Sequence, residues 1–520
     1  MSEKQINKEE TYRHPAVRTP SVVRLNEIAH SLNLDLSDGE LKEFQDVITK
    51  TIKTTYQRLY DLPDPKLPVK YARNQGYRPS AQENPLNAWY WRCDISGYGS
   101  GKLQGKTVAI KDSIPVAGIP MMNGSWILES FIPDIDATVI TRVLDQGGRI
   151  LGKATCENFC CSGASFTSAT GPVLNPVDHT RMCGGSSSGC AAVVATGEVD
   201  MAIGGDQGGS IRIPSAACGI VGLKPTFGLV PYTGISSIEA TLDHTGPMAR
   251  TVYDTALLLE ALAGREDEGL DPRQPNDLKV PEYTKQLTGD IKGLRIGLVK
   301  EGFDPNFEPD VNQLVKQSAE RLGEVGAVVE EVSIPWHLDG KHIFTGIFKE
   351  GGNRTMFDWY GAGTSARTYY DTQAQQVMAR GMKSHPNDHS SSVILVRLFA
   401  RYLLEDYNGM FYSKSQNLSR ELRKAYDEAF KNYDVIIMPT IPKKAPKLPP
   451  PHPSLAEYIE KAFELIPNTS PFNVSGHPSL TINAGLSEGL PVGMMITGKM
   501  FDESTVLNVA YAYEKLRDGV

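Results

Sequence analysis

The sequence predicts an α/β protein with a largely buried β-sheet, preceded by a small helical domain. From Lys106 onward, short apolar segments with strand character alternate with segments whose apolar residues recur three and four positions apart. Before residue 85 the helical pattern occurs without strands, and an irregular tract rich in Pro, Asn and Tyr follows it. With 520 residues, the chain is long enough to form one large core or several smaller ones.

The first 85 residues are expected to form the helical domain. Segments 22–34 and 38–62 carry apolar residues at helical spacing, Ser37 or Asp38 suits the cap of the second helix, and Pro63 ends it. The tract 62–68 (LPDPKLP) has the composition of a linker. We expect this domain, residues 1–85, to serve in dimerisation.

The second domain, residues 86–520, holds the alternating elements. Apolar segments predict strands at 107–110, 149–151, 294–299, 328–332 and 434–438, and helical periodicity predicts helices at 137–146 and 311–325. Small-residue apolar pieces also occur at 193–197, 201–203 and 220–222. Residues 340–431 are expected to form a mostly helical insertion, and 443–454 a proline-rich loop.

Composition and charge disfavour several classes of protein. The net charge is −8 with no stripe of Lys and Arg, whereas binding nucleic acid requires a concentrated basic surface. The N-terminus is polar, and no apolar run approaches the roughly 18–20 residues of a membrane-spanning helix, so we expect a cytoplasmic protein without a membrane partner. Seven cysteines, an odd number, disfavour a disulfide framework.

The most informative stretch runs from residue 184 to 212 (GGSSSGCAAVVATGEVDMAIGGDQGGSIR). It contains two glycine-rich turns, the first with Ser186, Ser187 and Ser188, the second with Ser210. A serine among bare backbone N–H groups offers acyl transfer a nucleophile with oxyanion donors beside it. Taken alone, each turn is better explained as an ordinary loop.

A nucleophilic serine needs a base to accept its proton, and a lysine of this chain can supply that base. Lys111 ends the apolar segment 107–110, where burial disfavours the ammonium form and lets the amine act as a base. Serine with lysine is a known variant of nucleophile and base. The alternative is that Lys111 reaches solvent or pairs with Asp112.

These residues resemble the amidase signature family. Its motifs correspond here to 184–189 (GGSSSG), 205–214 (GDQGGSIRIP) and 224–226 (KPT). Lys111 precedes Ser186 by 75 positions and Ser186 precedes Ser210 by 24, as in the family. The resemblance covers nearly everything after residue 85. The sequences GGDQGGSIRIPS, GLVPYTG, IEATLDH and GLDPRQ are similar to the bacterial nitrile-pathway (enantioselective) amidases, which also carry an extra N-terminal helical domain.

The resemblance implies a fold and a mechanism. The fold would be the amidase signature fold, with a large mixed β-sheet, mostly buried and flanked by helices. Ser210 would be the nucleophile, Ser186, after a cis peptide bond, the bridging serine, and Lys111 the neutral base. Backbone N–H groups of Gln207, Gly208, Gly209 and Ser210 would hold the oxyanion. The reaction would convert an amide to a carboxylic acid and ammonia through an acyl-enzyme, with no metal or other cofactor.

Further residues are expected to support this site. Asp206 and Arg212 flank the second turn and are expected to brace it, and Ser187 is expected to hydrogen-bond within the first turn. By resemblance, Cys160 and Cys161 fall where the family lines its acyl pocket. The pocket walls are expected from residues 159–161, 235–242, 340–410 and 471–474, which favour a largely apolar pocket for small aliphatic or aromatic carboxamides.

Other functions remain open at this point. The sequence Gly185–Gly189 also fits the nucleophile turn of an α/β-hydrolase, but the downstream Asp243-His244 pair suits no such triad. Cys156, Cys160 and Cys161 lack the spacing of metal ligands. A hydrolase of esters, anilides, carbamates or fatty amides has the same chemistry, and so does the glutaminase subunit of a tRNA amidotransferase. A non-enzymatic scaffold is disfavoured because all three catalytic positions are intact.

Overall fold

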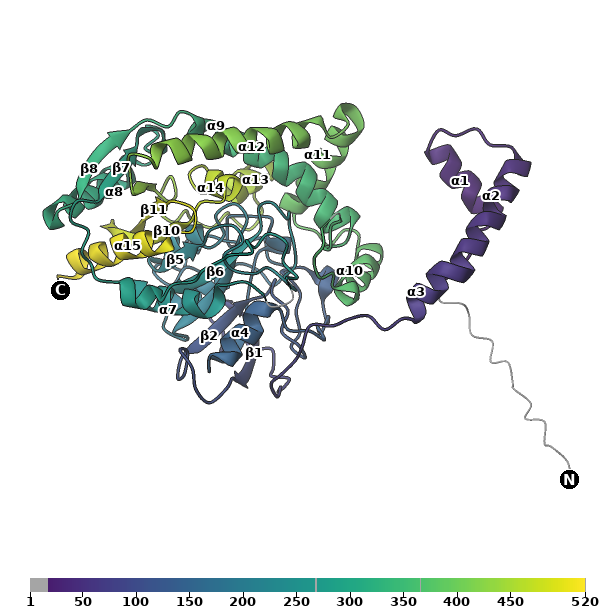
Figure 1. Cartoon of the computed structure of the whole chain (residues 1–520), viewed down its shortest axis with the longest axis horizontal. Coiled ribbons are helices and arrows are strands. Elements are labelled where there is room, and N and C mark those ends of the chain that lie inside the picture. The colour runs from purple at the N-terminus through teal and green to yellow at the C-terminus, as the bar shows by residue number, and fades with distance from the viewer. Residues whose placement is uncertain (1–16, 267–268, 365, 520) are drawn as a thin grey trace, which may run out of the picture. The chain divides into compact units, whose positions relative to one another are not determined.

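The computed structural model describes residues 17–266, 269–364 and 366–519, which divide into two compact units (Figure 1). The first unit ends at Lys66 and the second begins at Leu67. The division therefore falls before the expected boundary at residue 85. Segment 67–85 belongs to the larger unit, where Tyr71 donates a hydrogen bond to Asp145 over 2.7 Å and Arg73 pairs with Asp136.

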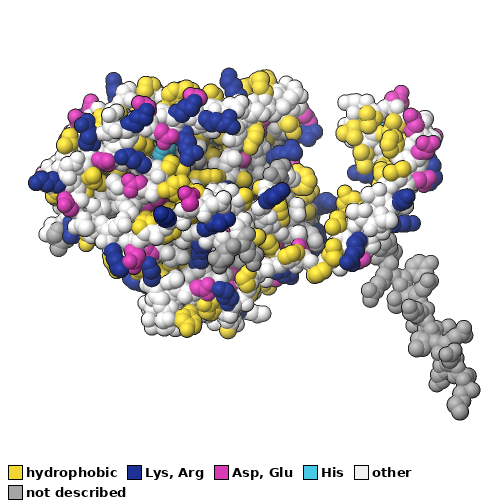
Figure 2. Space-filling view, in the orientation of Figure 1, with side chains coloured by type: hydrophobic (Ala, Val, Ile, Leu, Met, Phe, Trp, Pro, Cys, Tyr) yellow, Lys and Arg dark blue, Asp and Glu magenta, His cyan; other side chains and the backbone are white. Residues whose placement is uncertain are grey.

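The first unit consists of helices α1 (Val22–Ser31), α2 (Asp38–Thr51) and α3 (Gln57–Asp61), with a π-helical turn (Ile52–Tyr56) before α3. Ser37 caps α2 through a capping box with Glu40. Among the described residues of this unit, Ala29 and Leu41 are the only buried hydrophobic ones. Its other apolar side chains are partly or fully exposed, and Figure 2 shows many of them gathered on one side of the unit.

One mixed sheet forms the centre of the second unit and confirms the predicted α/β fold. Its strands, eleven among the described residues, are β1 (Trp89–Ser96), β2 (Thr107–Lys111), β3 (Arg149–Ala154), β4 (Met201–Asp206), β5 (Val221–Lys224), β6 (His244–Ala249), β7 (Arg295–Val299), β8 (Val328–Val332), β9 (Val435–Pro439), β10 (Ser479–Ser487) and β11 (Leu490–Gly498). They are ordered β1-β3-β2-β4-β6-β5-β10-β11-β9-β7-β8. Strand β2 runs parallel to β3 and β4, and β7 runs parallel to β8 and β9, whereas the remaining pairs are antiparallel.

Helices surround this sheet. They are α4 (Thr138–Asp145), α5 (Ser188–Ala195), α6 (Arg212–Cys218), α7 (Val252–Leu262), α8 (Pro309–Glu320), α9 (Trp336–Gly346), α10 (Thr372–Ser384), α11 (Ser391–Tyr407), α12 (Met410–Ala429), α13 (Leu455–Phe463), α14 (Ser470–Ser475) and α15 (Glu503–Asp518). Two π-helical segments, Ile347–Gly352 and Arg354–Asp358, continue α9. Residues 340–431 are therefore mostly helical, as the sequence predicts.

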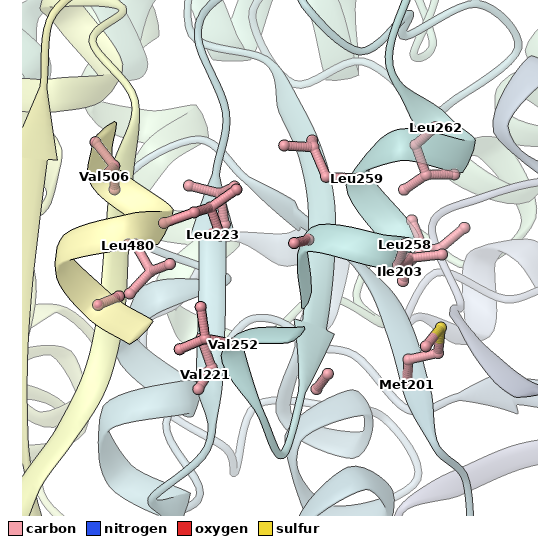
Figure 3. Packing of buried hydrophobic residues seen from close by; sticks show 14 of the residues in the cluster. Met201, Ile203, Val221, Leu223, Val252, Leu258, Leu259, Leu262, Leu480 and Val506 are labelled. Carbon is pink, nitrogen blue, oxygen red and sulfur yellow. The ribbon is translucent and has the colours of Figure 1, made fainter. Parts of the chain in front are cut away.

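The central strands are buried on both faces, whereas the edge strand β8 is largely exposed. Successive side chains of a strand point to opposite sides, and in β9 Val435 and Ile437 join the largest apolar cluster, whereas Ile436 and Met438 join a second one. Helices α7 and α15 cover the first face, where their leucine and valine side chains meet those of β4, β5 and β10 (Figure 3). This double burial explains the continuous apolar runs of the strands.

The same alternation directs Lys111 toward α5. In β2, Val108 and Ile110 belong to the first cluster, while Ala109 packs with the small residues of α5 in a third cluster. Lys111 lies two residues after Ala109 and so shares its side of the sheet. Helix α5 begins directly after Ser186 and Ser187, which brings these serines to the end of β2.

Candidate active site

Three parallel strands end together at one edge of the sheet. Strand β2 lies between β3 and β4 and parallel to both, so the carboxyl ends of all three meet. Lys111 ends β2, the cysteine-containing segment 156–161 follows β3, and Asp206 ends β4. The sites expected from separate parts of the sequence therefore converge here, a common arrangement in α/β proteins.

Lys111 contacts the first serine turn. Its side chain is fully buried, and Nζ lies 2.8 Å from Ser186 Oγ and 3.1 Å from the carbonyl oxygen of Gly205. The peptide bond between Gly185 and Ser186 is cis. In the described part of the chain, no carboxylate forms an ion pair with Lys111.

The alternative pairing of Lys111 with Asp112 does not occur. Asp112 Oδ1 instead lies 3.2 Å from Nζ of the buried Lys153. Its second oxygen accepts hydrogen bonds from the backbone N–H groups of Met122 and Asn123. Burial raises the pKa of Asp112 to about 6, against the opposing effects of Lys153 and these hydrogen bonds. Asp112 therefore anchors the loop after β2, and Lys111 remains free to face Ser186.

The second turn, residues 207–210, is held by Asp206 and Arg212. Arg212 donates hydrogen bonds to both carboxylate oxygens of Asp206 over 3.0 Å, and both side chains are fully buried. Asp206 also accepts the backbone N–H of Gly209 over 2.8 Å, so this N–H, which was expected to hold the oxyanion, is already engaged. Burial alone would raise the pKa of Asp206, but Arg212 and a hydrogen bond from Asn473 hold it well below its usual value. This network fixes the backbone that precedes Ser210.

The two turns are joined to each other. The backbone N–H of Ser187 donates to the carbonyl oxygen of Ser210 over 3.2 Å. The Ser187 hydroxyl does not bond within its own turn as expected; it donates to the carbonyl of Gly205 at the end of β4 over 3.2 Å. Gly209 adopts a φ of +133°, and a Cβ there would lie 2.3 Å from Thr469 Oγ1, so only glycine fits.

Two cavities lie on either side of Cys160 and Gln207, and the smaller of them borders Ser210. The larger has a volume of about 680 Å³ and the smaller about 30 Å³, and both are bordered by Cys160 and Gln207. Ser210 borders the smaller cavity and is 7% exposed. Apolar residues of the larger cavity include Met121, Leu128, Phe131, Phe159, Ile238, Met356, Met378 and Leu404; those of the smaller are Ile213, Phe344, Phe348, Phe463 and Ile466.

The two candidate pocket cysteines differ in position. Cys160 borders both cavities, and the neighbouring thiol of Cys156, with smaller effects of Lys111 and Ser186 against burial, lowers its pKa. Cys161 is fully buried, lies 3.8 Å from the sulfur of Met356, and borders neither of these cavities. Burial raises the Cys161 pKa well above its usual value. Cys161 therefore lies behind the pocket wall.

Several residues at the site had no individual signal in the sequence. Asn473 donates to Asp206, Thr469 donates to the carbonyl of Gly208 over 2.7 Å, and Tyr232 accepts a hydrogen bond from Gln207. The expected wall segment 471–474 borders neither cavity, because Asn473 points to the second turn instead. These partners are polar residues in segments remote from the turns, and only the folded chain brings them there.

Comparisons with known proteins agree with this architecture. The Amidase family matches residues 82–507. An enantioselective amidase of Rhodococcus rhodochrous is 44% identical over 499 residues, covering 94% of this chain and 95% of that protein. A glutamyl-tRNA(Gln) amidotransferase subunit from Methanosarcina barkeri is 37% identical, with 82% of this chain and 87% of that protein covered. A bacterial aryl acylamidase shares the fold, with a TM-score of 0.69, 23% identity and 96% of each chain covered.

These similarities and the fold define a hydrolase that acts on amide C–N bonds. Within that class, the chain belongs to the amidase signature family. In the part of the chain that the structure describes, no helix is both long and apolar enough to cross a membrane.

Proposed function

We propose that this chain is a free-standing amidase that hydrolyses carboxamides through Ser210, with Ser186 and Lys111 as a proton relay. The observation that carries the proposal is the buried contact of 2.8 Å between Lys111 Nζ and Ser186 Oγ. An uncharged amine has a lone pair that can accept the Ser186 proton.

The proposed reaction proceeds in two stages. Lys111 accepts the proton of Ser186 while Ser186 accepts that of Ser210, whose oxygen attacks the amide carbonyl carbon. The backbone N–H groups of Gln207, Gly208 and Ser210 stabilise the resulting oxyanion, each contributing about 3 kcal/mol. The N–H of Gly209 is already donated to Asp206. The relay then returns the proton to the nitrogen, the C–N bond breaks, and ammonia leaves. Water hydrolyses the acyl-enzyme by the same relay to give the carboxylic acid.

The cavities support small aliphatic and aromatic acyl groups as substrates. The larger cavity carries aromatic, methionine and leucine side chains, which favour apolar groups. The smaller cavity, about 30 Å³, has room for a small molecule such as water, which suits a leaving group as small as ammonia. Esters, anilides and carbamates, which use the same chemistry, are the competing substrates.

We also propose that the enzyme works in the cytoplasm as a homodimer. All seven cysteines are unpaired thiols, which a reducing compartment preserves. The exposed apolar side chains of the first unit are the surface that a second copy would cover.

Three single variants test the relay. We expect Ser210→Ala to form no acyl-enzyme, Lys111→Ala to lose about 10²–10⁴-fold in kcat, and Ser186→Ala to be severely but less completely impaired. Mass spectrometry of quenched reactions measures acylation of Ser210 directly. Ser188→Ala is the matched control, because this serine lies in the same turn but outside the relay. Near-normal turnover by Lys111→Ala at neutral pH would contradict the mechanism.

A panel of amides differing in acyl group and amine tests the substrate. Turnover of acetamide-to-benzamide compounds by the isolated chain supports the proposal. The amidotransferase alternative predicts that the isolated chain stays inactive on all amides, glutamine included, until its partner chains are added. Failure of every small amide while a long-chain amide or a carbamate reacts would overturn the substrate assignment.

A further inference from the structure

The side chain of Gln207 has one fixed and one open end. Its Nε2 donates a hydrogen bond to the Tyr232 hydroxyl over 2.8 Å. Among the described residues, none donates a hydrogen bond to its Oε1. Gln207 borders both cavities and its backbone belongs to the turn that carries Ser210. An amide oxygen that can accept a hydrogen bond is thus presented beside both cavities.

Tyr232 determines which end of Gln207 is fixed. The single hydroxyl proton of Tyr232 is donated to the carbonyl oxygen of Ser236 over 3.2 Å, so toward Gln207 the hydroxyl can only accept. It therefore selects the NH₂ end of the amide and turns the oxygen away. Burial, and then the charge of Asp243, raise the pKa of Tyr232 well above its usual value, so the phenol keeps its proton at neutral pH.

Tyr232 is itself held in place from two sides. Its backbone N–H donates to Asp271 over 2.9 Å, and the guanidinium of Arg273 lies 5.1 Å from the centre of its ring. Arg273 in turn pairs with Asp271. These contacts do not involve the hydroxyl, so its removal leaves the ring anchored. The orientation of Gln207 can therefore be altered separately from the packing around it.

We propose that Gln207 Oε1 accepts a hydrogen bond from the N–H₂ of the amide being cleaved, and that Tyr232 is the positioning residue that keeps this oxygen turned to the substrate. The inference rests on the proposed function. Among the parts of an unsubstituted carboxamide, this NH₂ is the donor that every substrate carries, whatever its acyl group. This hydrogen bond strengthens as the nitrogen becomes protonated and leaves. It therefore stabilises the transition state of C–N cleavage more than it stabilises the bound substrate.

The consequence is a preference for unsubstituted amides over esters of the same acid. An ester has no N–H to donate, so it gains nothing from Gln207. Removing the acceptor should consequently slow amide hydrolysis while leaving ester hydrolysis nearly unchanged. A merely structural role of Gln207 would slow both in the same proportion.

The test compares benzamide with methyl benzoate. We expect Gln207→Leu to lower kcat/KM for benzamide about tenfold or more and that for methyl benzoate less than about threefold. Tyr232→Phe should lower the amide-to-ester ratio about threefold. The double variant should match Gln207→Leu alone, because Tyr232 acts through Gln207. Tyr412→Phe, which removes a hydroxyl bonded to Glu239 elsewhere in the larger cavity, should leave the ratio unchanged.

A binding measurement decides the question without turnover. In Ser210→Ala, adding Gln207→Leu should weaken the binding of benzamide about tenfold and that of acetophenone, which lacks the N–H₂ group, less than about threefold. Equal losses for the two ligands, or for amide and ester in the kinetic test, would overturn the inference. Failure of the proposed function has a different signature, namely undiminished acylation in Ser210→Ala.

Discussion

The stability of the second turn depends on the buried charge of Arg212. This arginine is fully buried beside the second turn, and Asp206 is its ionic partner. The same carboxylate accepts the backbone N–H groups of Gly209 and Ile211. Asp206 therefore both neutralises the charge of Arg212 and holds the backbone of the turn in shape. Removing one partner of a buried pair costs far more than the pair contributes, because it leaves the other charge unpaired.

Asp206→Asn should therefore destabilise the protein strongly. We expect a loss of about 3–5 kcal/mol in the free energy of unfolding at pH 7, measured by denaturant titration. Asp94→Asn is the matched control, because Asp94 also pairs with an arginine, Arg149, but both side chains are about half exposed. That exposed pair should contribute less than about 1 kcal/mol. Similar losses in the two variants would contradict this account.

The dependence of this effect on pH follows from the lowered pKa of Asp206. A carboxyl whose pKa is lower in the folded state stabilises that state above the unfolded pKa, about 3.9 for Asp. This stabilisation is lost as the pH falls through the folded pKa. The difference between the parent and Asp206→Asn should thus persist from pH 7 down to about pH 4 and shrink only in stronger acid.

At the scale of elements, α5 connects the catalytic turns to the sheet through close packing. Every residue from Ser188 to Val194 is buried, and nearly all are small. At Gly189 an added Cβ would lie 2.2 Å from the backbone oxygen of Ala88 and 2.6 Å from the backbone nitrogen of Thr155. The absence of a side chain at this position lets the start of α5, and with it Ser186, approach Lys111.

Gly189→Ala should consequently impair both stability and activity. The methyl group has to displace backbone, so we expect a loss of about 1–3 kcal/mol in stability and a much larger relative loss in kcat than in substrate binding. Gly323→Ala provides the control, because a Cβ there meets no atom within 4 Å. Thermal denaturation and steady-state kinetics of both variants check this, and unimpaired turnover by Gly189→Ala would show that α5 can shift without moving the site.

Elements with a strong local pattern were predictable from sequence, and those defined by distant partners were not. The apolar strand before Lys111 and the capped helix after Ser37 have local causes. Strand β6 was not predicted, because its sequence HTGPMA contains glycine and proline and is a strand only through pairing with β4 and β5. The piece 193–197 is the end of α5 and a turn, since small apolar residues suit either structure.

The residues of the candidate site also divide into those that motifs predict and those that only distant contacts define. Lys111, Ser186 and Ser210 were identified from motifs and spacing, and the structure brings Lys111 and Ser186 into contact. Thr469 and Asn473 were missed as bracing residues, because each contacts the second turn from more than 260 positions away. Cys161 was expected in the pocket from the resemblance to the family, but its side chain borders neither cavity, whereas that of Cys160 borders both.

At the scale of the whole molecule, the two units differ in how completely they bury their apolar residues. The second unit has an extensive core on both faces of its sheet. The first leaves Val23, Val47 and Tyr60 more than 60% exposed. A small helical unit with so little core gains stability by covering this surface, and a second copy of the chain is the partner we propose.

Light scattering of the full chain tests this proposal. We expect a dimer that the double substitution Val47→Asp with Leu59→Asp converts to a monomer, because charges at an apolar interface lose hydration. Lys50→Glu, which changes the charge at an exposed position of α2, should leave the dimer intact. A monomeric parent chain, or a double variant that stays dimeric, would rule out this surface as the interface.

The bracing of the second turn by Thr469 and Asn473 has a consequence for biosynthesis. A ribosome produces Ser210 long before it produces these two partners. Until then the turn lacks the contacts that hold Gly208 and Asp206 in place, and β10, the neighbour of β5, is also missing. The nascent chain would thus carry its nucleophile through more than half of translation without a working site, and hydrolysis would begin only once the chain extends past residue 473.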